Sequence, residues 1–177
     1  TPTVPQLNLR FILNDNFRAV NRFYGYNVGT VMSCYRGRFS FEFAPSIALG
    51  AMDREVIIYG DTTTLSNVPG VQPTVALGGL LAQRTNIGNH EDTQFSVMPQ
   101  IGLNIGYAIT KNLRIFGGYT FLYANNVMRA GDAIDPVVDS RLIPPPAAGA
   151  NLATRPRFEF KDGDFWAQGI NIGAELR

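Results

Sequence analysis

Bulky apolar and very small side chains alternate over several long stretches of this chain, and no other feature restricts its fold as strongly. The clearest stretch covers residues 99–109. Its bulky positions are Ile101, Leu103, Ile105, Tyr107 and Ile109, and the positions between them hold Gly102, Asn104, Gly106 and Ala108. Because successive side chains of a β-strand point to opposite faces, this stretch is a predicted strand with one bulky apolar face and one small face.

The same alternation returns in other parts of the chain. Three further stretches show it, at residues 39–49, 113–123 and 166–176. A weaker version occurs at Leu7, Leu9, Phe11 and Leu13. Short turns at 36–38 and 110–112 join neighbouring strands into two predicted hairpins, the first of which begins at about Phe23.

Two connections are long, at about 60–93 and about 130–161, and both contain prolines. In an up-and-down antiparallel sheet, alternate connections lie at the same end. One rim of the sheet would therefore carry the short turns and the other rim the long loops, which is the asymmetry of an outer-membrane barrel.

The composition excludes several classes of protein. Only 16% of the 177 residues are charged, against about 25% in an ordinary soluble domain. The mean hydropathy of -0.01 and the lack of an apolar run of about 18 residues argue against membrane-spanning helices. The net charge of +1 provides no field that would favour nucleic acid.

The small face decides between a soluble sheet and a membrane barrel. The face opposite the bulky rows would meet water in a soluble barrel, yet it carries mainly Gly, Ala, Asn and Ser. Small residues suit the interior of a curved barrel, whose bulky outer face dissolves in hydrocarbon. We therefore predict an all-β fold, an antiparallel up-and-down transmembrane β-barrel, as one domain over residues 1–177.

Parity along the strands then assigns side chains to the two faces. The predicted lumen-facing residues are Glu42, Gln100, Asn104, Arg114, Asn171 and Glu175. The predicted lipid-facing residues are Ile101, Leu103, Ile105, Tyr107, Tyr119, Phe121, Trp166, Ile170 and Ile172. Aromatic residues near strand ends fit the girdles of a lipid interface. A soluble barrel with an aromatic core remains the alternative at this point.

The strand count is lower than a membrane barrel needs. About six strands can be counted, whereas the smallest ordinary membrane barrel has about eight. No secretory signal is visible at the start of the sequence. We expect either further strands upstream of this chain or several chains completing one barrel, and we expect a lipid-facing residue to follow Arg177.

Four short motifs carry a family resemblance. They are Asn21-Arg22-Phe23-Tyr24-Gly25, Gly79-Leu80-Leu81-Ala82-Gln83 with Thr85-Asn86-Ile87-Gly88, Arg129-Ala130-Gly131-Asp132-Ala133-Ile134-Asp135, and Asp164-Phe165-Trp166-Ala167-Gln168-Gly169-Ile170-Asn171. In this order they resemble the planctomycete-type putative beta-barrel porin family, the seventh in its naming series. The resemblance implies that this chain is the C-terminal portion of a barrel in the bacterial outer membrane, inserted by the barrel-assembly machinery.

Candidate chemistry is sparse. His90 is the only histidine, and we expect it in a solvated loop. Cys34 is expected to be a small apolar filler. Asp132, Asp135 and Asp139 could offer oxygen ligands to calcium, but their spacing misses that of a dedicated calcium loop. We predict no enzyme, no cofactor and no metal site.

Two functions follow from a membrane barrel. The first is a porin that passes small hydrophilic solutes by diffusion. The second is a plugged structural or surface-anchoring barrel whose external loops bind envelope partners. The expected partners are the lipid bilayer and, through the long loops, further copies of the chain or envelope proteins. Conductance in a planar bilayer would separate the two functions.

Overall fold

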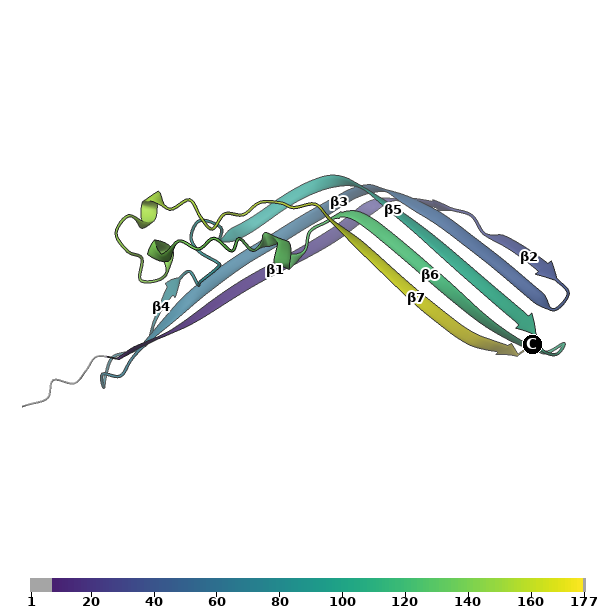
Figure 1. Cartoon of the computed structure of the whole chain (residues 1–177), viewed down its shortest axis with the longest axis horizontal. Helices are drawn as coiled ribbons and strands as arrows, with labels where there is room; N and C mark the ends of the chain where they lie inside the picture. The colour runs from purple at the N-terminus through teal and green to yellow at the C-terminus, as the bar shows by residue number, and fades with distance from the viewer. Residues whose placement is uncertain (1–7, 177) are drawn as a thin grey trace, which may run out of the picture. The chain divides into compact units, whose positions relative to one another are not determined.

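The structure is a computed structural model that describes residues 8–176 and is built from β-strands (Figure 1). The strands are β1 (Leu9–Gly29), β2 (Met32–Arg36), β3 (Phe39–Ser66), β4 (Thr74–Leu77), β5 (Gly88–Ala108), β6 (Leu113–Val127) and β7 (Gly163–Leu176). Three short 3-10 helices cover Ala130–Ala133, Ser140–Leu142 and Ala150–Leu152. The all-β prediction is confirmed.

All seven strands belong to one sheet, in the order β1-β3-β5-β6-β7, with β2 and β4 paired to β3. The pairings β2–β3, β3–β4, β5–β6 and β6–β7 are antiparallel. Close contacts of Gly25 with Gly50 and of Gly29 with Ser46 follow an antiparallel register between β1 and β3. The predicted up-and-down order is therefore present, and β1 and β7 are the two ends of the described sheet.

The chain divides into two compact units, which share β1, β3 and β5. Unit 1 comprises 1–20, 55–92 and 128–161, and unit 2 comprises 21–54, 93–127 and 162–177. The expectation of one barrel domain stays a prediction. Leu7 and Arg177, named in the sequence predictions, lie outside the described residues.

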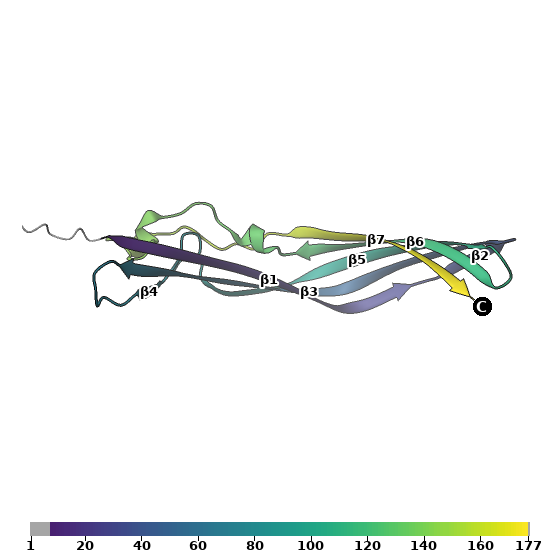
Figure 2. The same cartoon turned by 90° about the horizontal axis from the view of Figure 1, so that it is seen from below.

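Unit 2 is a sheet of alternating faces. In β5, β6 and β7 the bulky and the small side chains fall on opposite sides, because the register keeps like positions opposite one another. The hairpin turn between β2 and β3 uses Gly37 at a φ of 62°. This conformation suits the first central residue of a tight two-residue turn and favours glycine. Figure 2 shows β5, β6 and β7 side by side, as the register requires.

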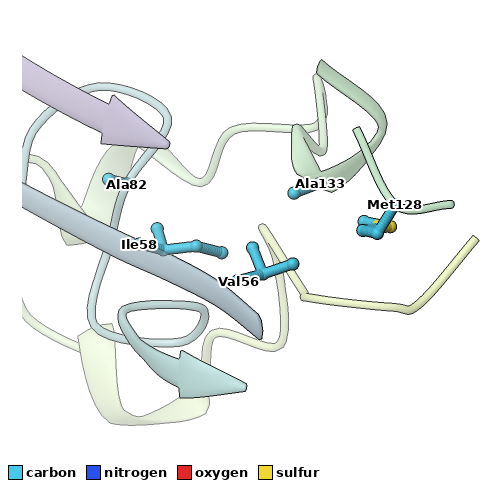
Figure 3. Packing of buried hydrophobic residues seen from close by; sticks show 5 residues of the cluster. All are labelled: Val56, Ile58, Ala82, Met128 and Ala133. Atoms are coloured by element: carbon cyan, nitrogen blue, oxygen red, sulfur yellow. The ribbon is translucent and has the colours of Figure 1, made fainter. Parts of the chain in front are cut away.

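Unit 1 has an ordinary apolar core (Figure 3). Its centre is the buried cluster Val56, Ile58, Ala82, Met128 and Ala133, against which Phe17, Ala19, Ile87, Phe158 and Phe160 pack. The core side chains of β3 are even-numbered, so this face of the strand is covered by the segments at 79–87 and 128–161. Burying this apolar surface stabilises unit 1 in the way that a soluble domain is stabilised.

One carboxylate holds the segment at 79–87 in place. Asp15 on β1 accepts hydrogen bonds from the backbone N–H groups of Leu81 and Ala82 at 3.0 and 2.8 Å. Asn86 is buried, and its side chain accepts from the N–H of Gln83 and donates to the carbonyl of Leu81. These bonds satisfy backbone groups that leave the sheet. The bonds of Asn86 thus link the Gly-Leu-Leu-Ala-Gln motif to the Thr-Asn-Ile-Gly motif.

Several predicted boundaries need correction. The first 21 residues of regular structure form one strand, β1, instead of a weak strand followed by a hairpin arm beginning near Phe23. The loop predicted at 60–93 is shorter, because β3 continues to Ser66, β4 occupies 74–77 and β5 begins at Gly88. Sequence alternation missed these parts because residues 61–64 are all polar and β4 has only four residues. Between Val127 and Gly163 the chain forms no described strand.

Candidate pore-lining face

The register brings the nine predicted lipid-facing side chains to one face of unit 2. Ile101 lies opposite Phe121, Leu103 opposite Tyr119, and Tyr119 opposite Ile170. The remaining members follow in the same register, with Ile105 and Ile172 flanking Gly117, Tyr107 opposite Ile115, and Trp166 opposite Tyr123. Ile170 and Ile172 are 79% and 85% exposed, so no other part of the described chain covers them. The face is a wide apolar surface, and its contact with lipid stays a prediction.

The six predicted lumen-facing residues occupy the opposite face, and five of them come together. Glu42, Asn104, Arg114, Asn171 and Glu175 line a recess of about 490 Å³ on unit 2. Phe116 and Ala174 complete its lining. Gln100 shares the face by parity with Asn104 but lies outside this recess. We call these five polar residues the polar cluster.

Two separate sets of hydrogen bonds join members of the polar cluster to residues of other strands. The Asn104 amide on β5 donates to Glu42 Oε1 on β3 at 3.0 Å. Arg114 on β6 donates to Glu175 Oε2 on β7 at 3.3 Å and to Ser40 Oγ on β3 at 2.7 Å. The Arg114 and Glu175 side chains remain 31% and 39% exposed, so the pair is open to solvent. Such a pair adds little stability, but it fixes two opposite charges on this face.

Glycines make room for these polar side chains. A Cβ at Gly106 would lie 2.5 Å from Arg114 Nε and from Ser40 Oγ, so Arg114 reaches β3 only by crossing over a glycine. A Cβ at Gly118 would collide with the side-chain oxygens of Asn104 and Asn171. The Phe116 ring covers Gly173 in the same way. The small residues that predicted a crowded inner face therefore accommodate long polar and aromatic neighbours.

The list of predicted lumen-facing residues omits two residues of this face, although parity already put Ser40 on it. Ser40 is buried and receives the Arg114 guanidinium. Arg54, also on the even-numbered side of β3, is only 2% exposed and forms an ion pair with Asp162 at 2.5 Å. Parity alone would have put Arg54 on this side of β3, but its burial is not visible in the sequence. Its partner lies 108 residues away, so the sequence alone offered no signal for the pair.

His90 and Cys34, the other two candidate residues, both lie on strands. His90 lies on β5 instead of in a loop, and its ring stacks on Phe158 at 3.9 Å between centroids. It is half-buried because Phe158 belongs to the aromatic layer over the unit 1 core. Cys34 is exposed on β2 and is not an apolar filler, because it lies opposite Phe41 on the open bulky face.

The three aspartates considered for calcium do not act together. Asp135 is almost buried; desolvation alone would raise its pKa, but hydrogen bonds from the Arg157 and Val137 N–H groups and from Arg155 lower the pKa overall. Arg141 lowers the pKa of Asp139 to about 2 through its side-chain and backbone hydrogen bonds. Both carboxylates thus form ion pairs with arginine side chains. Within residues 8–176, no group of three or more His, Cys, Asp or Glu side chains is arranged to hold a metal.

Comparisons with known proteins identify one family. The model of the family described as Putative beta barrel porin-7 matches residues 6–177, which is nearly the whole chain. No curated protein matches the sequence. In the described part of the chain, no helix is long and apolar enough to cross a membrane.

Proposed function

This chain belongs to the putative beta barrel porin-7 family, and we propose that it forms part of a bacterial outer-membrane pore for small hydrophilic solutes. The proposal rests on one observation, the two opposite faces of unit 2. One face exposes rows of Ile, Leu and aromatic side chains, and the other carries the polar cluster. Hydrocarbon is a suitable solvent for the first face and an aqueous channel for the second.

The polar cluster would act on passing solutes through its charges. Glu42, Arg114 and Glu175 line the same recess, and Arg114 is the only cation among the five residues of the polar cluster. Charged side chains on the wall of a pore select ions by electrostatic attraction and repulsion. We propose no catalytic reaction for this face. The proposed partners are the bilayer and the barrel-assembly machinery, with further copies of the chain or envelope proteins at the long loops.

Conductance across a planar bilayer tests the proposal. The protein should insert from detergent and conduct small ions. Arg114→Glu should shift the reversal potential in a salt gradient toward cations, because it replaces the single positive charge of the polar cluster by a negative one. Lys111→Glu, in the turn between β5 and β6, is the matched charge reversal outside the cluster and should shift it much less.

One result would contradict the predicted position of Arg114, and another would contradict the pore itself. Equal reversal potentials for Arg114→Glu and the unaltered protein would remove Arg114 from the conducting path. A barrel that inserts but never conducts would favour the second function, a plugged surface anchor. The ordered packing of segment 128–161 on the unit 1 core is the observation that keeps this second function open.

A further inference from the structure

Three strands of the sheet are much longer than a bilayer requires. β3 has 28 residues, and β1 and β5 have 21 each. A tilted strand crosses the hydrocarbon with about 9–11 residues. β6 and β7, with 15 and 14 residues, are closer to this length. Large parts of β1, β3 and β5 must therefore lie outside the hydrocarbon if the sheet spans a membrane.

The outward side of β3 becomes more polar along the strand. From Phe39 to Leu49 the outward, odd-numbered side chains are mostly aromatic or aliphatic, and the even-numbered ones are small or polar. From Glu55 onward the even-numbered Val56 and Ile58 are buried in the unit 1 core. The odd-numbered positions now include Glu55 and Asp61. The outward side of β3 is thus almost wholly apolar in unit 2, whereas in unit 1 Glu55 and Asp61 alternate there with Ile57 and Tyr59 and the opposite side is buried and apolar.

A polar row marks where the outward face changes. Asp53 Oδ1 accepts a hydrogen bond from Thr93 Oγ1 at 2.6 Å, which joins β3 to β5 on the outward face. The register of β1 with β3, fixed by Gly25 against Gly50 and by the hydrogen bond of Asn14 to Asp61, puts Arg22 opposite Asp53. We call Arg22, Asp53 and Thr93 the boundary row. All three belong to unit 2 and lie at its limit along the chain.

Aromatic residues stand next to the boundary row on its apolar side. Tyr24, which is 60% exposed, follows Arg22 by two residues on the same face of β1. On β7 the outward Trp166 lies opposite Tyr123 and follows the outward Asp164 by two residues. Amphipathic rings beside polar groups are typical of the junction between hydrocarbon and headgroups.

Beyond the boundary row the outward face carries charges that hydrocarbon would not accept. The register of β3 with β5 puts Glu55 opposite Glu91, and the Asn89 amide donates to both carboxylates, at 3.4 and 2.9 Å. Two like charges opposite each other on a sheet repel, and contact with water lowers this repulsion. Transfer of two carboxylates from water into hydrocarbon is unfavourable.

We propose that bilayer contact is confined to unit 2 and ends at the boundary row, so that unit 1 is a folded body in water. This inference rests on the proposed membrane function of unit 2 but is separate from its conductance. It assigns an interaction surface: the outward face of unit 2 between the short turns and the boundary row fits lipid chains. The outward face of unit 1 fits water and polar headgroups.

Spin labels along the outward face of β3 test this inference. In a Cys34→Ser background, single cysteines would be introduced by Phe41→Cys, Ile47→Cys, Glu55→Cys and Tyr59→Cys, labelled and reconstituted into phosphatidylcholine vesicles. Collision rates with oxygen, which concentrates in lipid, and with a soluble nickel chelate would then be measured. We expect oxygen to dominate at 41 and 47 and the nickel chelate to dominate at 55 and 59.

The outcomes separate the two proposals. Oxygen-dominated collisions at 55 and 59, as at 47, would overturn the boundary. Nickel-dominated collisions at 41 and 47 would instead overturn the membrane placement of unit 2, and with it the proposed pore. Where a β3 variant fails to fold, Ile105→Cys and Glu91→Cys provide the same comparison on β5, with the same expected difference.

Discussion

Single residues decide how closely the strands of unit 2 approach one another. Gly25 on β1 and Gly50 on β3 face each other so closely that a Cβ on Gly50 would lie 2.6 Å from the Gly25 Cα and collide with the Tyr24 carbonyl oxygen. Both obstacles are backbone atoms, which cannot rotate away as the end of a side chain can. Glycine is thus required at position 50 for the pairing of β1 with β3.

Gly50→Ala should therefore destabilise the protein. Overpacking of this kind costs about 1–3 kcal/mol, and the substitution should lower the free energy of unfolding by about that amount. Denaturation in detergent, followed through the fluorescence of Trp166, measures the change. Gly169→Ala is the matched control on β7, where a Cβ would meet no atom within 4 Å. Equal losses for the two variants would show that close strand approach is not the reason for Gly50.

The face on which the residues of the polar cluster lie could be predicted from the sequence, but their contacts could not. Parity placed Asn104, Arg114 and Glu175 on one face, because strand geometry has a fixed period of two. Parity could not reveal that Arg114 crosses Gly106 to reach Ser40, because that contact depends on the register between strands. It likewise gave no information on the partner of Arg54, because Asp162 follows a long connection.

At the scale of elements, β3 contains one part that was predicted correctly as a strand and one part that was predicted as a loop. Residues 39–49 were predicted as a strand because their alternation has a single phase. Residues 60–66 were predicted as loop, and Asp61-Thr62-Thr63-Thr64 shows no apolar alternation, yet these four residues pair with β4. Their pairing depends on β4 and on the covered face of unit 1, which are properties of the folded chain.

The segment 128–161 should respond to acid. The pKa values of Asp135 and Asp139 are lowered in the folded protein, to about 2 for Asp139, from an ordinary value of 3.8. A carboxyl group with a lowered pKa stabilises the fold fully above its unfolded pKa, and this contribution is lost as the pH falls toward the folded pKa. The ordering of the segment should therefore weaken between about pH 4 and about pH 2.

Hydrogen exchange of the backbone amides measures this effect, after correction for the intrinsic dependence of exchange on pH. Protection in 129–161 should fall below about pH 4, while protection in β6 should persist. Asp135→Asn should reduce protection already at pH 6, because the carboxylate that accepts from Arg155 and from the Arg157 N–H is lost. Full protection down to pH 2, or loss of protection above pH 5, would contradict the assignment.

At the scale of the whole molecule, the proposed pore requires that the bulky face of unit 2 contacts lipid and that its polar face contacts water. The bulky face of unit 2 is open to its surroundings throughout the described chain, whereas unit 1 encloses a buried apolar cluster and leaves other apolar side chains, such as Leu9 and Val75, exposed. A chain that contacts lipid through one face needs fewer charged residues than a chain that is surrounded by water. Membership of a barrel-porin family agrees with this division.

The most direct test of the two faces is the reaction of single cysteines with a charged methanethiosulfonate reagent during conductance recording. In a Cys34→Ser background, Asn104→Cys and Asn171→Cys place thiols on the polar face, and Ile105→Cys and Ile172→Cys place them one residue further along on the bulky face. We predict that the reagent changes the conductance of the first pair and leaves that of the second pair unaltered. Modification of conductance through Ile105→Cys and Ile172→Cys, with none through Asn104→Cys and Asn171→Cys, would contradict the account.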